Sequence, residues 1–205
     1  MLSKVIIDFK PVSPEHGGLF KGRDPLKIAR ELEKAGVLGL SVVTAKEHFG
    51  GSLDLLRDIS KTVKIPILRK DFIKTEEDLR ETLDSGADGV LLICSMCEDI
   101  GALHEKALSI GLKPVVEVHT AQEMELAKSI GAKIIGINNR DITILEKDSG
   151  MVDRTLELIK IAPKESFIIS ESGIRNREEA QKVINGGANA VLIGTAFWLG
   201  DFELT

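Results

Sequence analysis

Short runs of apolar residues, rich in Val, Ile and Leu, recur along the whole chain at fairly even spacing. Each run is almost continuously apolar, which is typical of strands in a parallel sheet that is covered on both faces. Eight such runs are present, at residues 5–9, 38–43, 65–70, 89–94, 114–119, 134–139, 167–172 and 190–195.

Amphipathic segments with helical periodicity separate these runs. Several begin with Asp, Ser or Thr and end with Gly, as capped helices do. Thr75 with Asp78, and Thr120 with Glu123, have the spacing of capping boxes. The clearest helical segments are residues 24–36, 75–86 and 120–132.

Strict alternation of strand and helix gives parallel strands joined by right-handed crossovers. Eight such units in 205 residues indicate an α/β protein, a compact (β/α)8 TIM barrel, rather than an open sheet. No linker or change of composition interrupts the pattern, so we expect one domain over residues 1–205.

Composition narrows the class of protein. Hydrophobic residues make up 43% and charged residues 29% of the chain, and the net charge is −5. This charge argues against general affinity for nucleic acid or for anionic membranes. No apolar run is long enough to cross a bilayer and no export signal precedes the first strand, so we expect a cytoplasmic protein.

Cys94 and Cys97 are the two cysteines, in a C-x-x-C arrangement. The four histidines are scattered, so the spacing does not indicate a zinc site and we expect no metal. A redox-active pair is an alternative, but the surrounding thioredoxin-like pattern is missing. We interpret the pair as two reduced thiols near the end of a strand.

Polar residues gather where the predicted strands end. In a (β/α)8 barrel, this edge forms the active site. Asp8 and Lys10 share a face of their strand and project side by side. Together with Lys70 and Glu117 they make a mixed acid–base set, suited to proton transfer around a carbonyl group. The other polar or small residues at strand ends are Asn138, Arg140, Glu171, Ser172, Gly194 and Thr195.

The segments ESGI and IGTA follow the seventh and eighth predicted strands. Barrels frequently bind phosphate between these two loops, where backbone N–H groups can approach an oxygen-rich ligand. A tight turn that requires glycine explains the same residues structurally, and both explanations can hold together. We therefore expect a small phosphorylated ligand.

Seven sequence blocks together are typical of one protein family. They occur along the chain in the order DFKPVSP, LSVVTAKEHFGGSLDLL, IPILRKDFI, VVEVH, IGINNRD, ISESGI and AVLIGTAF. In this arrangement the chain resembles the indole-3-glycerol-phosphate synthase family. The resemblance implies conversion of 1-(2-carboxyphenylamino)-1-deoxyribulose 5-phosphate to indole-3-glycerol phosphate in tryptophan biosynthesis. Ring closure, loss of carbon dioxide and loss of water would proceed without a metal or an organic cofactor.

The resemblance also implies roles for individual residues. Lys70 would be the general acid of ring closure, and Lys10 would pair with the anthranilate carboxylate. Glu117 would transfer protons and stabilise developing positive charge. Asn138 and Arg140 would orient the substrate.

The remaining implied site residues bind or position parts of the substrate. Phe49 would pack on the aromatic ring, and Glu171 would orient its neighbours. Those expected at the phosphate are Ser13, Ser172, Gly173, Gly194 and Thr195.

The chain departs from the family pattern in three ways. Asp8 stands where the family usually has glutamate, so its reach is one methylene shorter. The helices that cover the barrel mouth before the first strand are expected to be missing, together with most of the closing helix. Trp198, Leu199, Phe202 and Leu204 are then expected to cover the seam between the last and first strands. Apolar surface there would favour a homo-oligomer, or contact with another enzyme of the tryptophan pathway.

Two other functions remain open at this point. A sister barrel such as phosphoribosylanthranilate isomerase shares the last two loops, but RKDF and VVEVH argue against it. A barrel that only binds a phosphorylated ligand or acts as a scaffold is the second alternative, and the presence of Lys70, Glu117, Asn138 and Arg140 argues against that.

Overall fold

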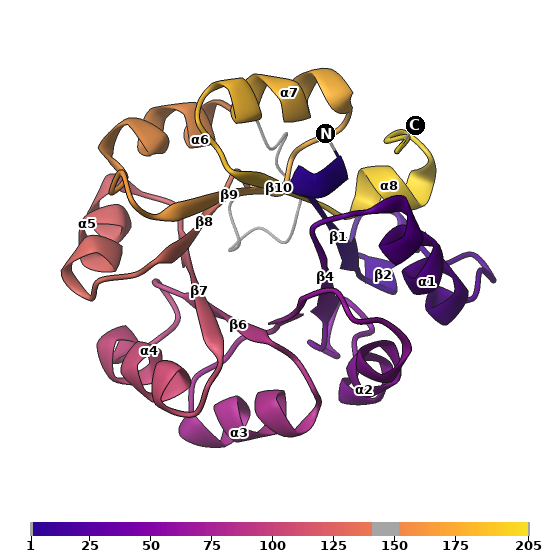
Figure 1. The fold of residues 1–205 in the computed structure, drawn as a ribbon, viewed down its shortest axis with the longest axis horizontal. Helices are drawn as coiled ribbons and strands as arrows, with labels where there is room; N and C mark the ends of the chain where they lie inside the picture. Colours follow the sequence, from indigo (N-terminus) through magenta and orange to yellow (C-terminus); the bar gives the residue numbers. More distant parts are fainter. Residues whose placement is uncertain (1, 141–151, 205) are drawn as a thin grey trace.

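The computed structural model describes residues 2–140 and 152–204. Eight parallel strands close into a barrel in the order β1-β10-β9-β8-β7-β6-β5-β4, and helices surround it on the outside (Figure 1). The predicted (β/α)8 barrel is therefore confirmed. The barrel strands are β1 (Val5–Phe9), β4 (Gly39–Val43), β5 (Ile67–Lys70), β6 (Gly89–Ile93), β7 (Lys113–Val118), β8 (Ile134–Asn138), β9 (Phe167–Glu171) and β10 (Ala190–Ile193).

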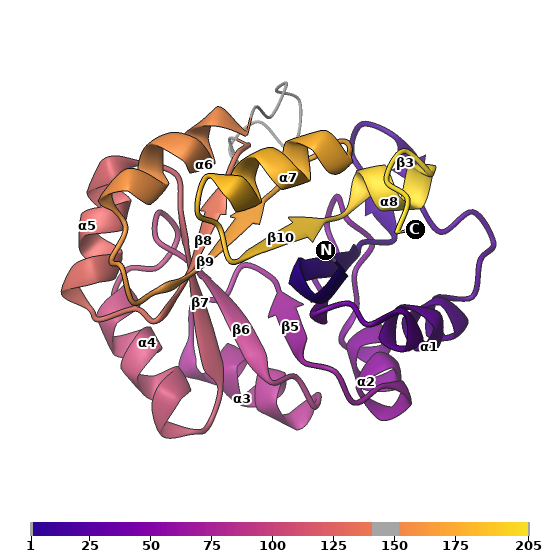
Figure 2. The same cartoon turned by 45° about the horizontal axis from the view of Figure 1, so that its top comes forward.

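The helices follow the strands along the chain, and the turned view in Figure 2 shows them on the outer side of the barrel. Their buried faces pack on the outward side chains of the strands in two large apolar clusters. A smaller cluster that includes Ile6, Leu91 and Leu192 fills the interior of the barrel. The helices are α1 (Pro25–Ala35), α2 (Leu53–Thr62), α3 (Glu76–Asp84), α4 (Ile100–Ser109), α5 (Ala121–Ser129), α6 (Asp153–Leu158), α7 (Arg177–Asn185) and α8 (Thr195–Leu199), with short 3-10 helices η1 (Leu2–Lys4) and η3 (Ile159–Ile161).

Helix ends match the capping signals of the sequence. The Asp24 side chain accepts hydrogen bonds at the start of α1, and Gly36 ends this helix with φ +81°, a conformation that glycine adopts without strain. Thr75 and Thr120 cap α3 and α5, each in a capping box. These caps fix where the loops at the barrel rim meet the helices.

The seam between β10 and β1 is covered by residues after the last strand. Trp198 of α8 is buried, donates through Nε1 to the backbone oxygen of Asp8 at 2.7 Å and packs edge-on against Phe9 at 5.2 Å between ring centroids. Phe202 is also buried in this cluster, and Leu199 and Leu204 are partly buried against it. The predicted cover for the seam is therefore present, while subunit association stays a prediction.

The segment after β1 contains a small hairpin that the sequence did not indicate. Strand β2 (Val12–Ser13) pairs antiparallel with β3 (Gly17–Gly18) beside the barrel mouth. The Val12 amide donates to the Phe49 carbonyl at 2.9 Å, so the hairpin also fixes the loop that carries Phe49.

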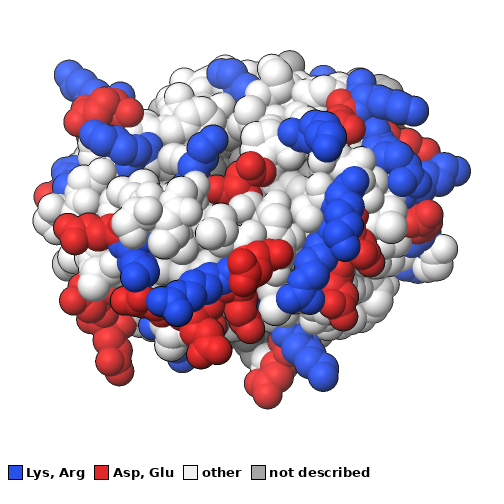
Figure 3. Space-filling view, turned by 60° about the horizontal axis from the view of Figure 1, so that its bottom comes forward, with Lys and Arg blue, Asp and Glu red and all other residues white. Residues whose placement is uncertain are grey.

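Surface charge is mixed. Lys and Arg side chains are interspersed with Asp and Glu side chains over the face drawn in Figure 3, which agrees with the modest net charge of −5. Among the described residues, no helix has both the length and the apolar character needed to cross a membrane.

Candidate active site

A cavity of about 460 Å³ opens at the carboxyl ends of the barrel strands. Side chains from both the charged strand ends and the glycine-containing loops line it, as the sequence analysis expects. Ten of the thirteen candidate site residues are in the lining: Asp8, Lys10, Phe49, Lys70, Asn138, Arg140, Ser172, Gly173, Gly194 and Thr195.

The other three candidates lie outside the lining. Glu117 and Glu171 are wholly buried and Ser13, in β2, is 1% exposed. The two glutamates belong to the strands that form the barrel wall, β7 and β9. Ser13 instead lies in the hairpin at the mouth.

Lys70 and Glu117 form the central ion pair. Their Nζ and Oε2 atoms are 3.9 Å apart, and the lysine side chain keeps 20% of its surface exposed while the glutamate has none. Lys70 ends β5 and Glu117 lies in β7, with β6 between them. The lysine therefore faces the cavity and the carboxylate supports it from the wall. A cation held in this way can stabilise negative charge that develops on a substrate oxygen.

Glu171 is a second buried acid in this cluster. Its pKa is raised to about 8, chiefly by burial and also by the nearby Glu117 and Asp8 carboxylates, while the Lys70 ammonium partly offsets this rise. A carboxyl group with this pKa is mostly protonated at neutral pH, and it can then donate a hydrogen bond. The cluster thus combines an acid, a carboxylate and an ammonium, which is suited to proton transfer.

Lys10 also lines the cavity, just after β1 and two residues after Asp8. Its Nζ atom is 5.7 Å from the centroid of the Phe49 ring. A cation beside an aromatic ring matches a substrate that is both anionic and aromatic. Gly194 lies close to Asp8, because a Cβ atom added to this glycine would come within 3.4 Å of the aspartate Oδ2.

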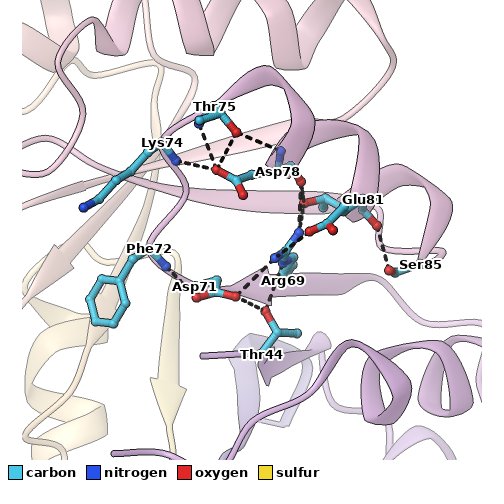
Figure 4. Close-up of polar contacts among 10 residues, drawn as sticks. Thr44, Arg69, Asp71, Phe72, Lys74, Thr75, Asp78, Glu81 and Ser85 are labelled. Atoms are coloured by element: carbon cyan, nitrogen blue, oxygen red, sulfur yellow. Dashed lines mark hydrogen bonds and ion pairs between the residues drawn. The ribbon is translucent and has the colours of Figure 1, made fainter. Parts of the chain in front are cut away.

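A buried arginine holds the strand end that carries Lys70 (Figure 4). Arg69 is 4% exposed, and its guanidinium donates to Thr44 Oγ1 at 2.9 Å, to the Asp78 carbonyl at 2.9 Å and to Asp71 Oδ2 at 3.2 Å. Asp71 in turn accepts from the Phe72 amide at 2.8 Å. Successive strand residues point to opposite faces, so Arg69 anchors β5 to α3 while Lys70 points inward.

Asn139 holds the loop after β9 in place through its side-chain hydrogen bonds. Its Nδ2 donates to Ser170 Oγ, to the Glu171 carbonyl and to the Ser172 carbonyl at 3.0–3.1 Å. Its Oδ1 accepts from the amide and the hydroxyl of Thr155. Ser172 has φ +62°, an unusual conformation for a residue with a side chain. Asn139 therefore holds the loop that carries Ser172 and Gly173 in place.

Sequence reasoning missed these supporting residues. Arg69 and Asp71 lie within RKDF and Asn139 within GINNRD, so the motifs that identified Lys70 and Asn138 also contained their supports. A polar residue next to an inward-pointing functional residue was the sequence signal that could have indicated these supporting side chains.

The two cysteines are free thiols, as expected. The pKa of Cys94 is raised to about 12, chiefly by burial and to a smaller extent by the charges of Glu123, Cys97 and Glu117. Burial also raises the pKa of Cys97. Thiols of this kind are poor nucleophiles. Among the described residues, no group of His, Cys, Asp and Glu side chains is arranged to hold a metal ion.

The model of the indole-3-glycerol phosphate synthase family matches residues 2–201. The chain is 42% identical over 193 residues to the indole-3-glycerol phosphate synthase of Pyrococcus abyssi, covering 94% of this chain and 84% of that protein. It is 41% identical over 201 residues to the Aquifex aeolicus enzyme of the same name, covering 95% and 76%.

The chain belongs to the indole-3-glycerol phosphate synthase family. Membership confirms the resemblance carried by the seven sequence blocks, and it disfavours the sister isomerase. The fold itself is shared more widely: a solved structure of N-acetylmannosamine-6-phosphate 2-epimerase from Clostridium perfringens matches with a TM-score of 0.72 at 17% identity, covering 94% of this chain and 86% of that one. This likeness supports the barrel and says nothing of the reaction.

Proposed function

We propose that the chain is an indole-3-glycerol phosphate synthase, a carboxy-lyase of tryptophan biosynthesis that acts in the cytoplasm. Its substrate would be 1-(2-carboxyphenylamino)-1-deoxyribulose 5-phosphate. The observation that carries the proposal is the Lys70–Glu117 pair, 3.9 Å apart, at a cavity whose rim also holds Ser172, Gly194 and Thr195. Family membership supplies the reaction that this arrangement fits.

Ring closure joins the aromatic carbon that bears the carboxylate to the ketone carbon of the sugar chain. Lys70 protonates the ketone oxygen as the bond forms, so that no free alkoxide accumulates. Electrostatic help of this kind is worth about 3 kcal/mol. Glu117 holds the ammonium in place and stabilises positive charge on the ring system until carbon dioxide leaves.

Dehydration then removes the hydroxyl group formed from the ketone oxygen, together with a proton, as water. Glu171, whose pKa of about 8 keeps it mostly protonated at neutral pH, lies beside Glu117 and Lys70 and would supply a proton during this step. Lys10 binds the anthranilate carboxylate before it is lost, and Asp8 sets the position of Lys10 from the same strand end.

The remaining lining residues bind the substrate. Phe49 packs on the aromatic ring, and Asn138 and Arg140 orient the sugar hydroxyls. The loops of Ser172 with Gly173 and of Gly194 with Thr195 hold the phosphate, and Ser13 supports the same end of the substrate from the hairpin. The chemistry needs no metal or organic cofactor.

Turnover tests this proposal directly. The purified chain is mixed with the carboxyphenylamino-deoxyribulose phosphate and the fluorescence of the indole product is followed. We expect product formation that saturates with substrate. Absence of product at high enzyme concentration, with indole-3-glycerol phosphate still bound in calorimetry, would instead support a barrel that only binds its ligand.

A further inference from the structure

His119 lies between a buried glutamate of the site and the start of a helix. Its Nε2 atom is 3.3 Å from Glu117 Oε1, and its Nδ1 atom is 3.4 Å from Glu123 Oε2. The imidazole is only 11% exposed, Glu117 is wholly buried and Glu123 is 17% exposed. Because His119 is two residues after Glu117, both side chains project from the same side of the chain.

The carboxylate of Glu123, on the other side of His119 from Glu117, is fixed by its helix. Glu123 completes the capping box of α5, where Thr120 Oγ1 accepts from its amide. Its own carboxylate accepts from the Thr120 amide at 3.2 Å and from the His119 amide. Burial raises the pKa of Glu123, but hydrogen bonds from the side chain and amide of His119 outweigh it, and the net pKa is lowered. Glu123 is therefore a carboxylate anion held in a fixed position beside the His119 imidazole.

His119 Nε2 and Glu117 Oε1 lie 3.3 Å apart, yet both atoms are buried without a hydrogen-bond partner among the described residues. A neutral imidazole carries one N–H group and one lone pair, so it can donate to only one of the carboxylates. The second contact is favourable only if the imidazole is cationic or if a carboxyl group donates to its lone pair. A proton placed between His119 and Glu117 would satisfy both buried atoms, and the other oxygen of Glu117 faces Lys70 at 3.9 Å.

We propose that His119 is a positioning residue that holds Glu117 toward Lys70 and shares a proton with it. The row Lys70–Glu117–His119–Glu123 would then link the cavity to the partly exposed start of α5. This role rests on the proposed function, since it concerns the proton that Glu117 handles during turnover. The motif VVEVH contains both Glu117 and His119, but only Glu117 was assigned a role from the sequence.

Other ionisable groups face this row and contribute to any pH dependence. Glu171 of β9 faces Glu117 and Lys70, and Asp8 acts on Glu171 from β1. Cys94, at the end of β6, is influenced by both Glu117 and Glu123, but with a pKa of about 12 it remains a neutral thiol in the working range. Cys94 therefore takes no part in the proton exchange that is proposed for Glu117 and His119.

The test compares His119→Asn with a matched control. Asparagine keeps one donor but cannot hold the extra proton. We expect kcat to fall about tenfold or more and KM to change little, and the acid and base limbs of the kcat–pH profile to move by about one pH unit. Glu123→Gln should also move both limbs of the kcat–pH profile, by a smaller amount. His104→Asn replaces another buried histidine, in α4, and should leave the profile unchanged.

An unchanged kcat–pH profile in folded His119→Asn protein would overturn the proposal, even if the amplitude of kcat were lower. A second measurement avoids any variant at position 119. Nitrogen-15 NMR of the His119 ring in the unaltered chain and in Glu117→Gln should show a ring protonation that depends on Glu117. Identical titration in the two proteins would contradict the shared proton. Because NMR does not depend on turnover, this result is distinguishable from failure of the proposed function.

Discussion

The carboxyl group of Glu171 occupies the space that a side chain at Gly136 would fill. A Cβ atom added to this glycine would overlap Glu171 Oε1 and lie 2.9 Å from Cδ. Gly136 and Glu171 belong to the neighbouring strands β8 and β9. Glycine weakens a strand in general, but here it creates the room in which a buried acid is held beside Glu117 and Lys70.

Gly136→Ala is expected to displace Glu171 and to lower kcat by about a hundredfold, because a shift of about 1 Å in a supporting group is enough for such a loss. A double-mutant cycle with Glu171→Ala isolates the cause. Once the carboxyl group is removed, the alanine at 136 should cost little more. Steady-state kinetics of the four proteins make the comparison, and independent, additive losses would contradict the relationship. Gly18→Ala, where a Cβ has open space, controls for the substitution itself.

Glu171 should make stability depend on pH. Its pKa is near 8 in the folded chain, above the usual value of 4.5, so the folded state binds a proton that the unfolded state has released between these values. The free energy of unfolding from this group is therefore largest below about pH 4.5 and is lost as pH rises toward about 8. Urea unfolding from pH 5 to 8 should show a steeper decline in the unaltered chain than in Glu171→Gln. Equal slopes would mean that Glu171 ionises normally.

Arg69→Ala should destabilise the fold by about 3–5 kcal/mol, because it removes the buried cation that pairs with the Asp71 carboxylate at 3.2 Å and links β5 to α3. Lys70 should lose its fixed position as well, so kcat should fall. Arg80→Ala provides the control: its ion pair with Glu76, at 3.9 Å, involves side chains that are 69% and 56% exposed, and its loss should cost less than about 1 kcal/mol. Similar effects of the two variants in urea unfolding would refute the anchoring role of Arg69.

Asn139→Ala should act on substrate binding through the loop of Ser172. Without the amide, the Ser172 carbonyl loses its donor and the residue is free to leave its left-handed conformation. We expect KM to rise about tenfold with a smaller change in kcat, since the loop is proposed to bind the non-reacting phosphate. Asn185→Ala, on exposed α7 surface, serves as the comparison. A fall in kcat with KM unchanged would place the role of Asn139 elsewhere.

The barrel could be predicted from the sequence because its signals are local. The run VIIDF coincides with β1, and the other seven runs match their strands within two residues at each end. Both predicted capping boxes form. Each of these features depends on residues close together in the chain, so composition and spacing were sufficient.

The support of the site could not be predicted in the same way, because it depends on contacts between strands and helices. His119 was one of four scattered histidines until β7 and α5 placed it between two carboxylates. Gly136 gave no signal before β9 placed Glu171 over it. The hairpin of β2 and β3 was missed because strands of two residues show no periodicity.

Lys70→Ala provides the most direct test of the account, with Lys74→Ala on the exposed surface four residues later as its control. Rates of indole formation and the Kd for indole-3-glycerol phosphate are measured for both variants. The account predicts that Lys70→Ala loses about a thousandfold or more in kcat while the fold and the Kd are nearly unchanged, because the ammonium acts in the transition state. A Lys70→Ala protein that keeps most of its kcat would contradict the assignment of the acid at the centre of the site.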